Sequence, residues 1–258
     1  MQVNLRRAIA VTSAIVGLCS IALTAHAADP NTLWNIVHGQ CVPNVRAHGD
    51  PSPCVKVDLS AGEAAGFAVL KDINGATQFL LIPTRRISGI ESPALLARGA
   101  TNYFAAAWDE RDRVAWKLLH PMPRETLSLA INSEVGRTQN QLHIHIDCIR
   151  PDVRDALWRE RSAIGRRWAP LPAPLAGHRY RAMRLDGETL GDRNPFKLLA
   201  RGVPGAAADM GHHTLVVVGM WYDDGGPGFV ILDDHADLAH GDRASGEDLQ
   251  DHDCKIGR

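Results

Sequence analysis

The sequence lacks an excess of charge of either sign, since 28 lysines and arginines are balanced by 29 aspartates and glutamates in 258 residues. This balance excludes a surface built to coat nucleic acid, although it permits a locally basic ligand pocket. Long apolar runs are scarce, because residues 8–25 form the single run long enough to span a bilayer. The C-x-x-C spacing of common thiolate metal sites is also absent, which disfavours a metal held by cysteines.

The one long apolar run has the features of a secretory signal. Arg6 and Arg7 precede it, and Ala25-His26-Ala27 follows it as an A-x-A site. This order is typical of a signal peptide cleaved after Ala27. The alternative is an uncleaved anchor, since roughly 18 apolar residues are just enough to cross the hydrocarbon core. In both cases we expect the rest of the chain to lie outside the cytoplasm.

Four cysteines follow this segment, and their even number in an oxidising compartment predicts two disulfides. Cys41 and Cys54 flank a loop that contains proline and glycine, which suits a local bridge. Cys148 and Cys254 would then tie the C-terminal tail to an apolar strand. The alternative is four free, buried thiols.

The pattern of apolar residues predicts a mixture of helices and strands. Helices are expected at 29–41, with Asp29 as cap, at 92–119 as one helix or two, and at 152–168, with Asp152 as cap. Strands are expected at 126–134 and 141–149. Two hairpins are expected, one over 66–87 around Asn74-Gly75 and one over 213–237.

These elements predict an α+β fold with two halves, 28–150 and 151–258, after the signal or anchor at 1–27. The second hairpin resembles the first in order and length, so the second half is either a degenerate repeat or an unrelated unit that contains a common motif. The two halves could also form one integrated domain.

The stretch QLHIHID, Gln141 to Asp147, carries the most specific polar pattern. Side chains alternate on a strand, so His143, His145 and Asp147 share one face, and the leucine and isoleucines between them share the other. Such a row is a metal site, a catalytic row or a half-exposed strand face.

The surrounding sequence favours the catalytic row. FLLIPTRRISGIESPAL at 79–95, a helix, and then LSLAINSEVGRTQNQLHIHID at 127–147 resemble the histidine triad superfamily. The export signal, the Gln139-Asn140-Gln141 run and the His-x-His-x-Asp ending are similar to the bacterial CDP-diacylglycerol pyrophosphatase family within it. Two positions depart from the superfamily pattern: Asp147 replaces the third histidine, and Arg86 stands where a histidine is common.

The resemblance implies an antiparallel sheet of histidine triad type and a role for each matching residue. His145 would be the nucleophile on phosphorus, and His143 would bind phosphate. Asp147 would orient an imidazole or a water molecule. The substrate-binding residues implied in this way, together with nearby arginines that could meet the phosphate charge, are Gln139, Asn132, Arg137, Arg86 and Arg85. The alternative for each arginine is a solvated strand end or turn, and for Asn132 it is a turn cap.

The implied reaction is hydrolysis of CDP-diacylglycerol to CMP and phosphatidate through a cytidylyl-histidine, with no cofactor or metal, at a membrane surface on the periplasmic side of the inner membrane, or in the periplasm if the signal is cleaved. One alternative is a secreted hydrolase of another nucleotide diphosphate. Another is a periplasmic metal-binding protein that uses His143, His145 and Asp147. The sequence leaves the oligomeric state and the roles of His212 and His213 open.

Overall fold

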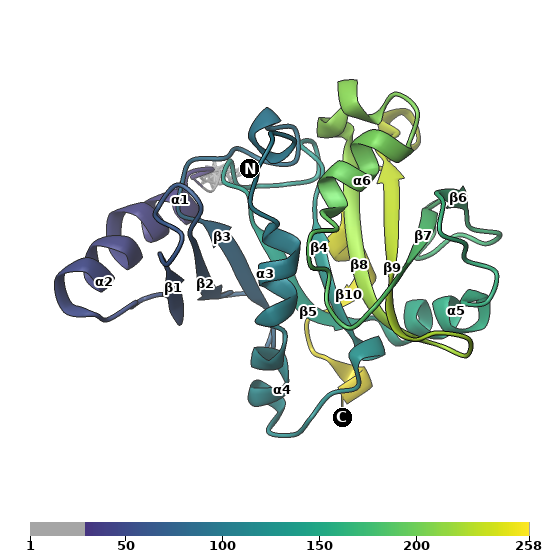
Figure 1. The fold of residues 1–258 in the computed structure, drawn as a ribbon, viewed down its shortest axis with the longest axis horizontal. Coiled ribbons are helices and arrows are strands. Elements are labelled where there is room, and N and C mark those ends of the chain that lie inside the picture. Colours follow the sequence, from purple (N-terminus) through teal and green to yellow (C-terminus); the bar gives the residue numbers. More distant parts are fainter. Residues whose placement is uncertain (1–28, 258) are drawn as a thin grey trace, which may run out of the picture.

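The computed structural model describes residues 29–257, so the predicted signal or anchor at 1–27 lies outside the described residues. Across 29–257, no helix has both the length and the apolar character needed to cross a membrane. The chain forms an α+β structure around one ten-stranded antiparallel sheet, which confirms the predicted fold class at this level (Figure 1).

The sheet order is β1-β2-β3-β5-β4-β8-β9-β7-β6, and β10 pairs with the end of β5. The strands are β1 (Lys56–Asp58), β2 (Phe67–Lys71), β3 (Phe79–Pro83), β4 (Leu127–Ile131), β5 (Ile144–Ile149), β6 (Ala169–Pro170), β7 (Arg181–Asp186), β8 (His213–Tyr222), β9 (Gly226–His235) and β10 (Gln250–Asp251). The helices are α1 (Thr32–Ile36), α2 (Val42–His48), α3 (Tyr103–Asp109), α4 (Asp112–Leu118), α5 (Pro151–Glu160) and α6 (Pro195–Gly202).

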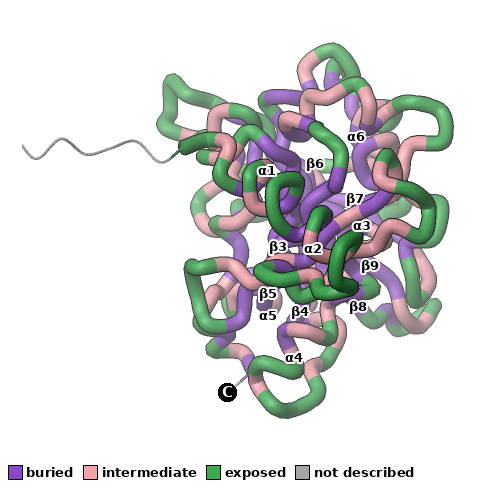
Figure 2. The backbone as a smooth tube through the Cα atoms, turned by 90° about the vertical axis from the view of Figure 1, so that its left-hand side faces the viewer, coloured by how far each residue is buried: buried purple, intermediate pink, exposed green. Residues whose placement is uncertain are grey.

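Both faces of the sheet are covered. Helices α3, α4 and α6 lie in front of it in Figure 1, and their apolar side chains form one core with Leu129, Ile144 and Ile146. The opposite face packs against α5 near β8 and β9, and against α1 and α2 near β3. Figure 2 shows β3, β4 and β5 as buried backbone inside a shell of exposed loops. Polar side chains on the central strands are therefore buried on either face.

The predicted hairpins and central strands are confirmed, and several boundaries differ. The N-terminal helical segment continues through a π-helical turn and α2 to His48, beyond the predicted end at Cys41. The region 92–119 contains two short helices, α3 and α4. Helix α5 ends at Glu160 instead of 168, and Asp152 lies in its first turn, where it pairs with Arg150 instead of capping the helix. Strand β7 and helix α6 were not predicted, because the polar and arginine-rich stretch around them hides their periodicity.

The strand order is symmetric about the centre of the sheet. Apart from the edge strand β1, one half reads β2-β3-β5-β4 toward the centre and the other reads β6-β7-β9-β8, and β4 pairs with β8 where they meet. In this arrangement the hairpin β8–β9 corresponds to β4–β5. The sequence pattern instead likens it to β2–β3, because both are strand pairs joined by a glycine-containing turn.

Both predicted disulfides are present. Cys41–Cys54 ties the N-terminal helices to the loop before β1, and Cys148–Cys254 ties β5 to the C-terminal segment. All four cysteines are buried. The second bridge holds the tail beside the strand that carries the histidines.

We expect reduction to destabilise the protein, since each bridge restricts the unfolded chain. The separations are 13 residues for Cys41–Cys54 and 106 for Cys148–Cys254. Loop-closure entropy assigns them about 3 and about 5 kcal/mol. Urea unfolding of Cys41→Ser/Cys54→Ser and Cys148→Ser/Cys254→Ser variants measures each loss. Four free thiols in the mass spectrum of the untreated protein would contradict the prediction.

Candidate active site

A cavity of about 520 Å³ opens beside His143 and His145. Its wall comes from α1, from the end of β2 with the turn that follows, and from the loop at 136–139. His143, His145 and Glu247 line it as well. The cavity thus brings together segments that are far apart in the sequence.

His145 is held in the middle of the sheet. It lies between Leu80 of β3 and Ala130 of β4 and is 4% exposed. Its Nδ1 faces the Gln78 side chain and lies 3.4 Å from Glu247 Oε1, whereas its buried Nε2 has no hydrogen-bond partner. Burial lowers the pKa of His145 to about 3, although the charge of Glu247 acts in the opposite direction. The ring is therefore neutral at pH 7.

His143 precedes β5 and lines the same cavity. Its Nδ1 lies 2.7 Å from the carbonyl oxygen of Gln141, so this nitrogen carries the proton and donates it. The ring stands edge-on to His145, with centroids 4.9 Å apart. Burial lowers the pKa of His143, so this ring is neutral as well.

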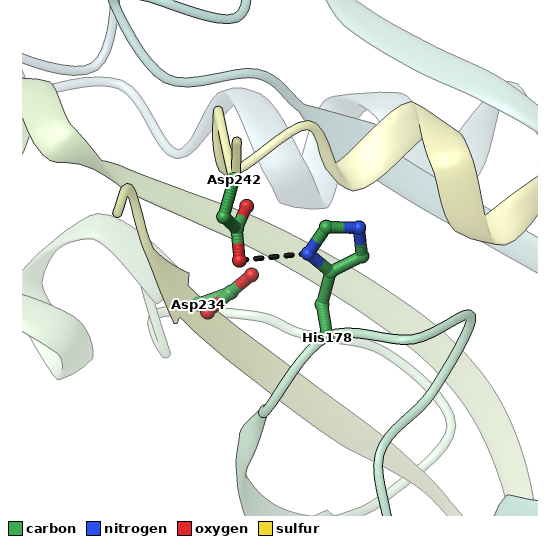
Figure 3. A group of neighbouring side chains, drawn as sticks. All are labelled: His178, Asp234 and Asp242. Atoms are coloured by element: carbon green, nitrogen blue, oxygen red, sulfur yellow. Dashed lines mark ion pairs between the residues drawn. The ribbon is translucent and has the colours of Figure 1, made fainter. Parts of the chain in front are cut away.

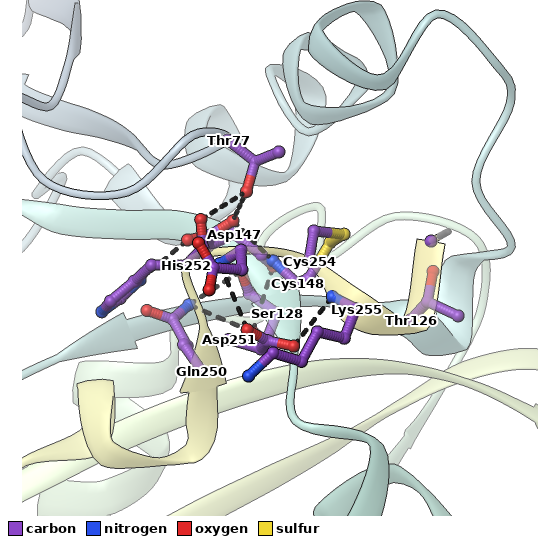
Figure 4. The surroundings of a disulfide bond; sticks show 12 residues. Thr77, Thr126, Ser128, Asp147, Cys148, Gln250, Asp251, His252, Cys254 and Lys255 are labelled. Carbon is purple, nitrogen blue, oxygen red and sulfur yellow. Dashed lines mark hydrogen bonds and ion pairs between the residues drawn. A yellow bond between two sulfur atoms is a disulfide. The ribbon is translucent and has the colours of Figure 1, made fainter.

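Asp147 is fully buried and binds the C-terminal segment. One carboxylate oxygen accepts hydrogen bonds from Thr77 Oγ1 at 2.6 Å and from the Cys148 amide at 2.9 Å. The other oxygen lies 2.8 Å from His252 Nδ1 (Figure 4). Burial raises the pKa of Asp147, while the hydrogen bonds from His252 and Thr77 act against this rise. Asp147 is on the same strand face as His145, as predicted from the alternation, but it is not among the residues that line the cavity.

Residues 247–252 complete the site. Hydrogen bonds to Asp147 and Glu247 raise the pKa of His252 to about 10, so this imidazole is a cation. Burial alone would raise the pKa of Glu247, but the hydrogen bonds from His252 and Asn132 hold it well below its usual range. The site therefore contains two neutral imidazoles, one imidazolium and an ionised carboxylate.

Sequence reasoning missed Glu247 and His252, because no motif or periodic pattern marks them. The available signal was the predicted bridge between Cys148 and Cys254. It places His252 two residues from a cysteine attached to β5, and therefore close to Asp147.

Two of the predicted substrate-binding residues, Asn132 and Gln139, line the cavity. Asn132 positions Glu247, since its side chain donates to Glu247 Oε2 at 3.1 Å and accepts from the Glu247 amide at 3.1 Å. Gln139 holds the start of α1, because it accepts from the Leu33 amide at 3.1 Å and donates to the Asp29 carbonyl at 2.9 Å.

The three predicted arginines are not among the lining residues. Arg137 forms a two-pronged ion pair with Glu91, at 2.6 and 2.9 Å. Arg86 bonds Asn31 and lies over the Trp34 ring, and Arg85 is exposed. Among the described residues that line the cavity, Lys71 is the one lysine or arginine, and burial lowers its pKa.

The alternative metal reading requires His143, His145 and Asp147 to converge, but the Asp147 oxygens face Thr77 and His252. Within residues 29–257, the group of side chains close enough to share a metal ion is a different one: His178, Asp234 and Asp242.

Paired neutral imidazoles, a carboxylate and a lysine around one cavity make it the candidate active site, and these groups suit a phosphorylated substrate. Comparison with known proteins specifies the class. The family model for CDP-diacylglycerol pyrophosphatase matches residues 28–258. A CDP-diacylglycerol pyrophosphatase from Yersinia pestis is 45% identical over 228 residues, which cover 88% of this chain and 85% of that protein. The chain belongs to the CDP-diacylglycerol pyrophosphatase family and is a phosphoric anhydride hydrolase.

The His252 imidazolium predicts how stability depends on pH. Its pKa in the folded protein, about 10, exceeds the ordinary value of 6.5. The folded state then holds a proton that the unfolded state has lost, so this contribution is full below pH 6.5 and disappears as pH rises through 10. We expect the unfolding free energy of the native protein to fall across this window, and that of His252→Gln to fall less steeply.

Urea unfolding at several pH values across this window tests the expectation. Asp147→Asn should also make the unfolding free energy fall less steeply with pH, because it removes one of the two carboxylates that raise the pKa of His252. His48→Gln is the matched control, since His48 is exposed and remote from these carboxylates. Parallel profiles for the native protein and His252→Gln would show that His252 is not the titrating group.

Proposed function

We propose that the protein hydrolyses the pyrophosphate bond of CDP-diacylglycerol to CMP and phosphatidate through a covalent cytidylyl-histidine on His145. The observation that carries the proposal is the state of the His145 ring. It is neutral and lines the cavity, and its Nε2 has no hydrogen-bond partner. In the tautomer with the proton on Nδ1, the lone pair on Nε2 is a nucleophile near pH 7. Glu247 Oε1, 3.4 Å from Nδ1, favours this tautomer, which requires the Gln78 amide to turn its oxygen toward Nδ1.

In the first step, Nε2 of His145 attacks the cytidylyl phosphorus. A P–N bond forms, the P–O bond to phosphatidate breaks, and the electron pair of that bond leaves on the phosphatidate oxygen. Phosphatidate is a phosphate monoester with a second pKa of about 6, so it can depart without receiving a proton. Glu247, 3.4 Å from Nδ1, would balance the positive charge that develops on the ring.

In the second step, water attacks the same phosphorus. The P–N bond breaks, its electron pair returns to Nε2, and the proton lost by water passes to solvent. CMP is released. The imidazole that Asp147 orients in this scheme is His252, whose positive charge would stabilise the phosphate during hydrolysis.

Substrate phosphates need donors, and the cavity offers several. The positions of Lys71, His143 and Gln139 on its wall support a binding role for each. Asn132 would act through Glu247, which it holds. Arg85, Arg86 and Arg137 have weaker support, because their side chains are exposed or bound to other residues.

We also infer that the fold is of histidine triad type and that residues 151–258 are a degenerate repeat of 28–150. The symmetric strand order supports the repeat. The two halves share one sheet, and His-x-His-x-Asp occurs on β5 but not on the corresponding β9. The first half thus keeps the catalytic row.

A membrane-bound substrate implies contact with a lipid surface, and we place the protein on the periplasmic side of the inner membrane, or in the periplasm if residues 1–27 are removed. The two disulfides fit an oxidising compartment. The rim of the cavity carries Ile73, whose side chain is 98% exposed, next to Leu70 and Ile36. This apolar rim is suited to the acyl chains.

His145→Ala should lower turnover by roughly a thousandfold or more, because it removes the nucleophile. CMP release from CDP-diacylglycerol measures turnover, and acid quench with cytidine-labelled substrate traps the intermediate. The native protein should yield a cytidylylated peptide that contains His145. His143→Ala should retain residual activity. His48→Ala controls for loss of a histidine elsewhere, and near-native turnover of a folded His145→Ala variant would refute the mechanism.

Ile73→Ser should reduce turnover of CDP-diacylglycerol in vesicles and leave turnover of a detergent-dispersed, short-chain analogue unchanged. The expected loss is severalfold, since full burial of one large apolar side chain contributes about 1.5–3 kcal/mol and contact with a membrane surface buries only part of it. Leu238→Ser is the matched control, because Leu238 is 59% exposed and does not line the cavity. If both variants reduced vesicle turnover equally, or neither did, the proposed contact between the apolar rim and the acyl chains would be wrong.

A further inference from the structure

A second group of ionisable side chains lies in the C-terminal half. His178 comes from the loop before β7, Asp234 from the end of β9, and Asp242 from the turn that follows (Figure 3). His178 Nδ1 is 2.7 Å from Asp242 Oδ2, and one nitrogen or oxygen from each of the three residues lies within 4.8 Å of the others. The group borders a cavity of about 470 Å³.

Each carboxylate has one oxygen bound to the backbone and one that faces the group. Asp234 Oδ1 accepts from the His235 amide at 2.8 Å, and Asp242 Oδ1 accepts from the Ala244 amide at 2.8 Å. The remaining oxygen of Asp234 is buried and has no hydrogen-bond partner, in a residue that is 5% exposed. An unpartnered buried carboxylate oxygen is costly unless a proton or a cation meets it.

The charges around this oxygen are mainly negative. Asp242 contributes a second carboxylate close to Asp234. Arg181, which also borders the cavity, is engaged by Asp233 at 2.8 Å. At the rim, Asp237 pairs with His240 at 2.6 Å. Arg181 and His240 are therefore engaged by other carboxylates, whereas the exposed Arg179 borders the cavity without an ion pair among the described residues.

We propose that His178, Asp234 and Asp242 bind a divalent transition-metal cation such as Zn²⁺, at a site separate from the catalytic cavity. One imidazole nitrogen and two carboxylate oxygens are a ligand set that Zn²⁺ accepts, and water from the adjoining cavity completes its coordination. The cation neutralises the two carboxylates and occupies the open oxygen of Asp234. The proposal rests on this geometry and is independent of the proposed hydrolysis.

The site also has a defined place relative to the catalytic cavity. Asp234 lies on β9, which corresponds to β5 in the symmetric sheet. It is two residues from Leu232, so both side chains lie on the sheet face that carries His145. Asp242 and Glu247 belong to one segment, and Asn132 holds the far end of it through Ser245 and Glu247. A cation at Asp242 would fix the near end of the segment that delivers Glu247.

Zinc titration of the full, tag-free exported protein tests the site. After chelator treatment and removal of the chelator, calorimetry with Zn²⁺ should show about one ion bound per chain in the native protein. Asp234→Asn should weaken this binding by at least the roughly tenfold to hundredfold that loss of an outer-shell partner costs. Zn²⁺ should raise the melting temperature of the native protein and not that of the variant.

Three variants make the result specific. Asp237→Asn, at the rim, and His145→Ala, in the catalytic cavity, should both bind Zn²⁺ as the native protein does. His178→Gln should lose binding as Asp234→Asn does, and it serves as the ligand variant if Asp234→Asn fails to fold. Native-like binding by folded Asp234→Asn or His178→Gln, loss of binding in His145→Ala, or no binding by the native protein would each overturn the proposal.

Discussion

The buried hydrogen bond between Asp147 and His252 is the interaction on which the catalytic half depends. A carboxylate inside a sheet covered on both faces must find a positive or donating partner, because burial without one costs several kcal/mol. Thr77 supplies one donor from the hairpin turn, and His252 supplies the charged one from the C-terminal segment. The Cys148–Cys254 bridge and the pairing of β10 with β5 keep that segment in place.

This arrangement gives histidines of the same intrinsic chemistry opposite protonation states. His145 and His143 are buried and neutral, since desolvation disfavours their charged forms. His252 is charged, because two carboxylates bind it. Neutral imidazoles and a fixed imidazolium therefore coexist at one pH, which is the combination that the proposed attack on phosphorus requires.

Corresponding strands of the symmetric sheet each contribute one residue to a polar cluster, since His145 lies on β5 and Asp234 lies on β9. The first half carries the histidines of β5, and the second carries a carboxylate pair with His178. The segment at 242–252 touches both, since Asp242 lies in one cluster while Glu247 and His252 lie in the other. A single short segment therefore supplies side chains to both clusters.

The sequence by itself determined the local structure of the catalytic row. Alternation in QLHIHID placed His143, His145 and Asp147 on one strand face, Asn74-Gly75 marked the first hairpin, and cysteine number and spacing indicated both bridges. These features depend on periodicity and turn chemistry, which act over a few residues. The tertiary structure alone decided that Asp147 turns to His252, that Glu247 faces His145, and that Lys71 lines the cavity while Arg137 is bound by Glu91. Those outcomes depend on which side chains from distant segments meet in a buried space, where desolvation and charge fix the partners, and no local pattern encodes such meetings.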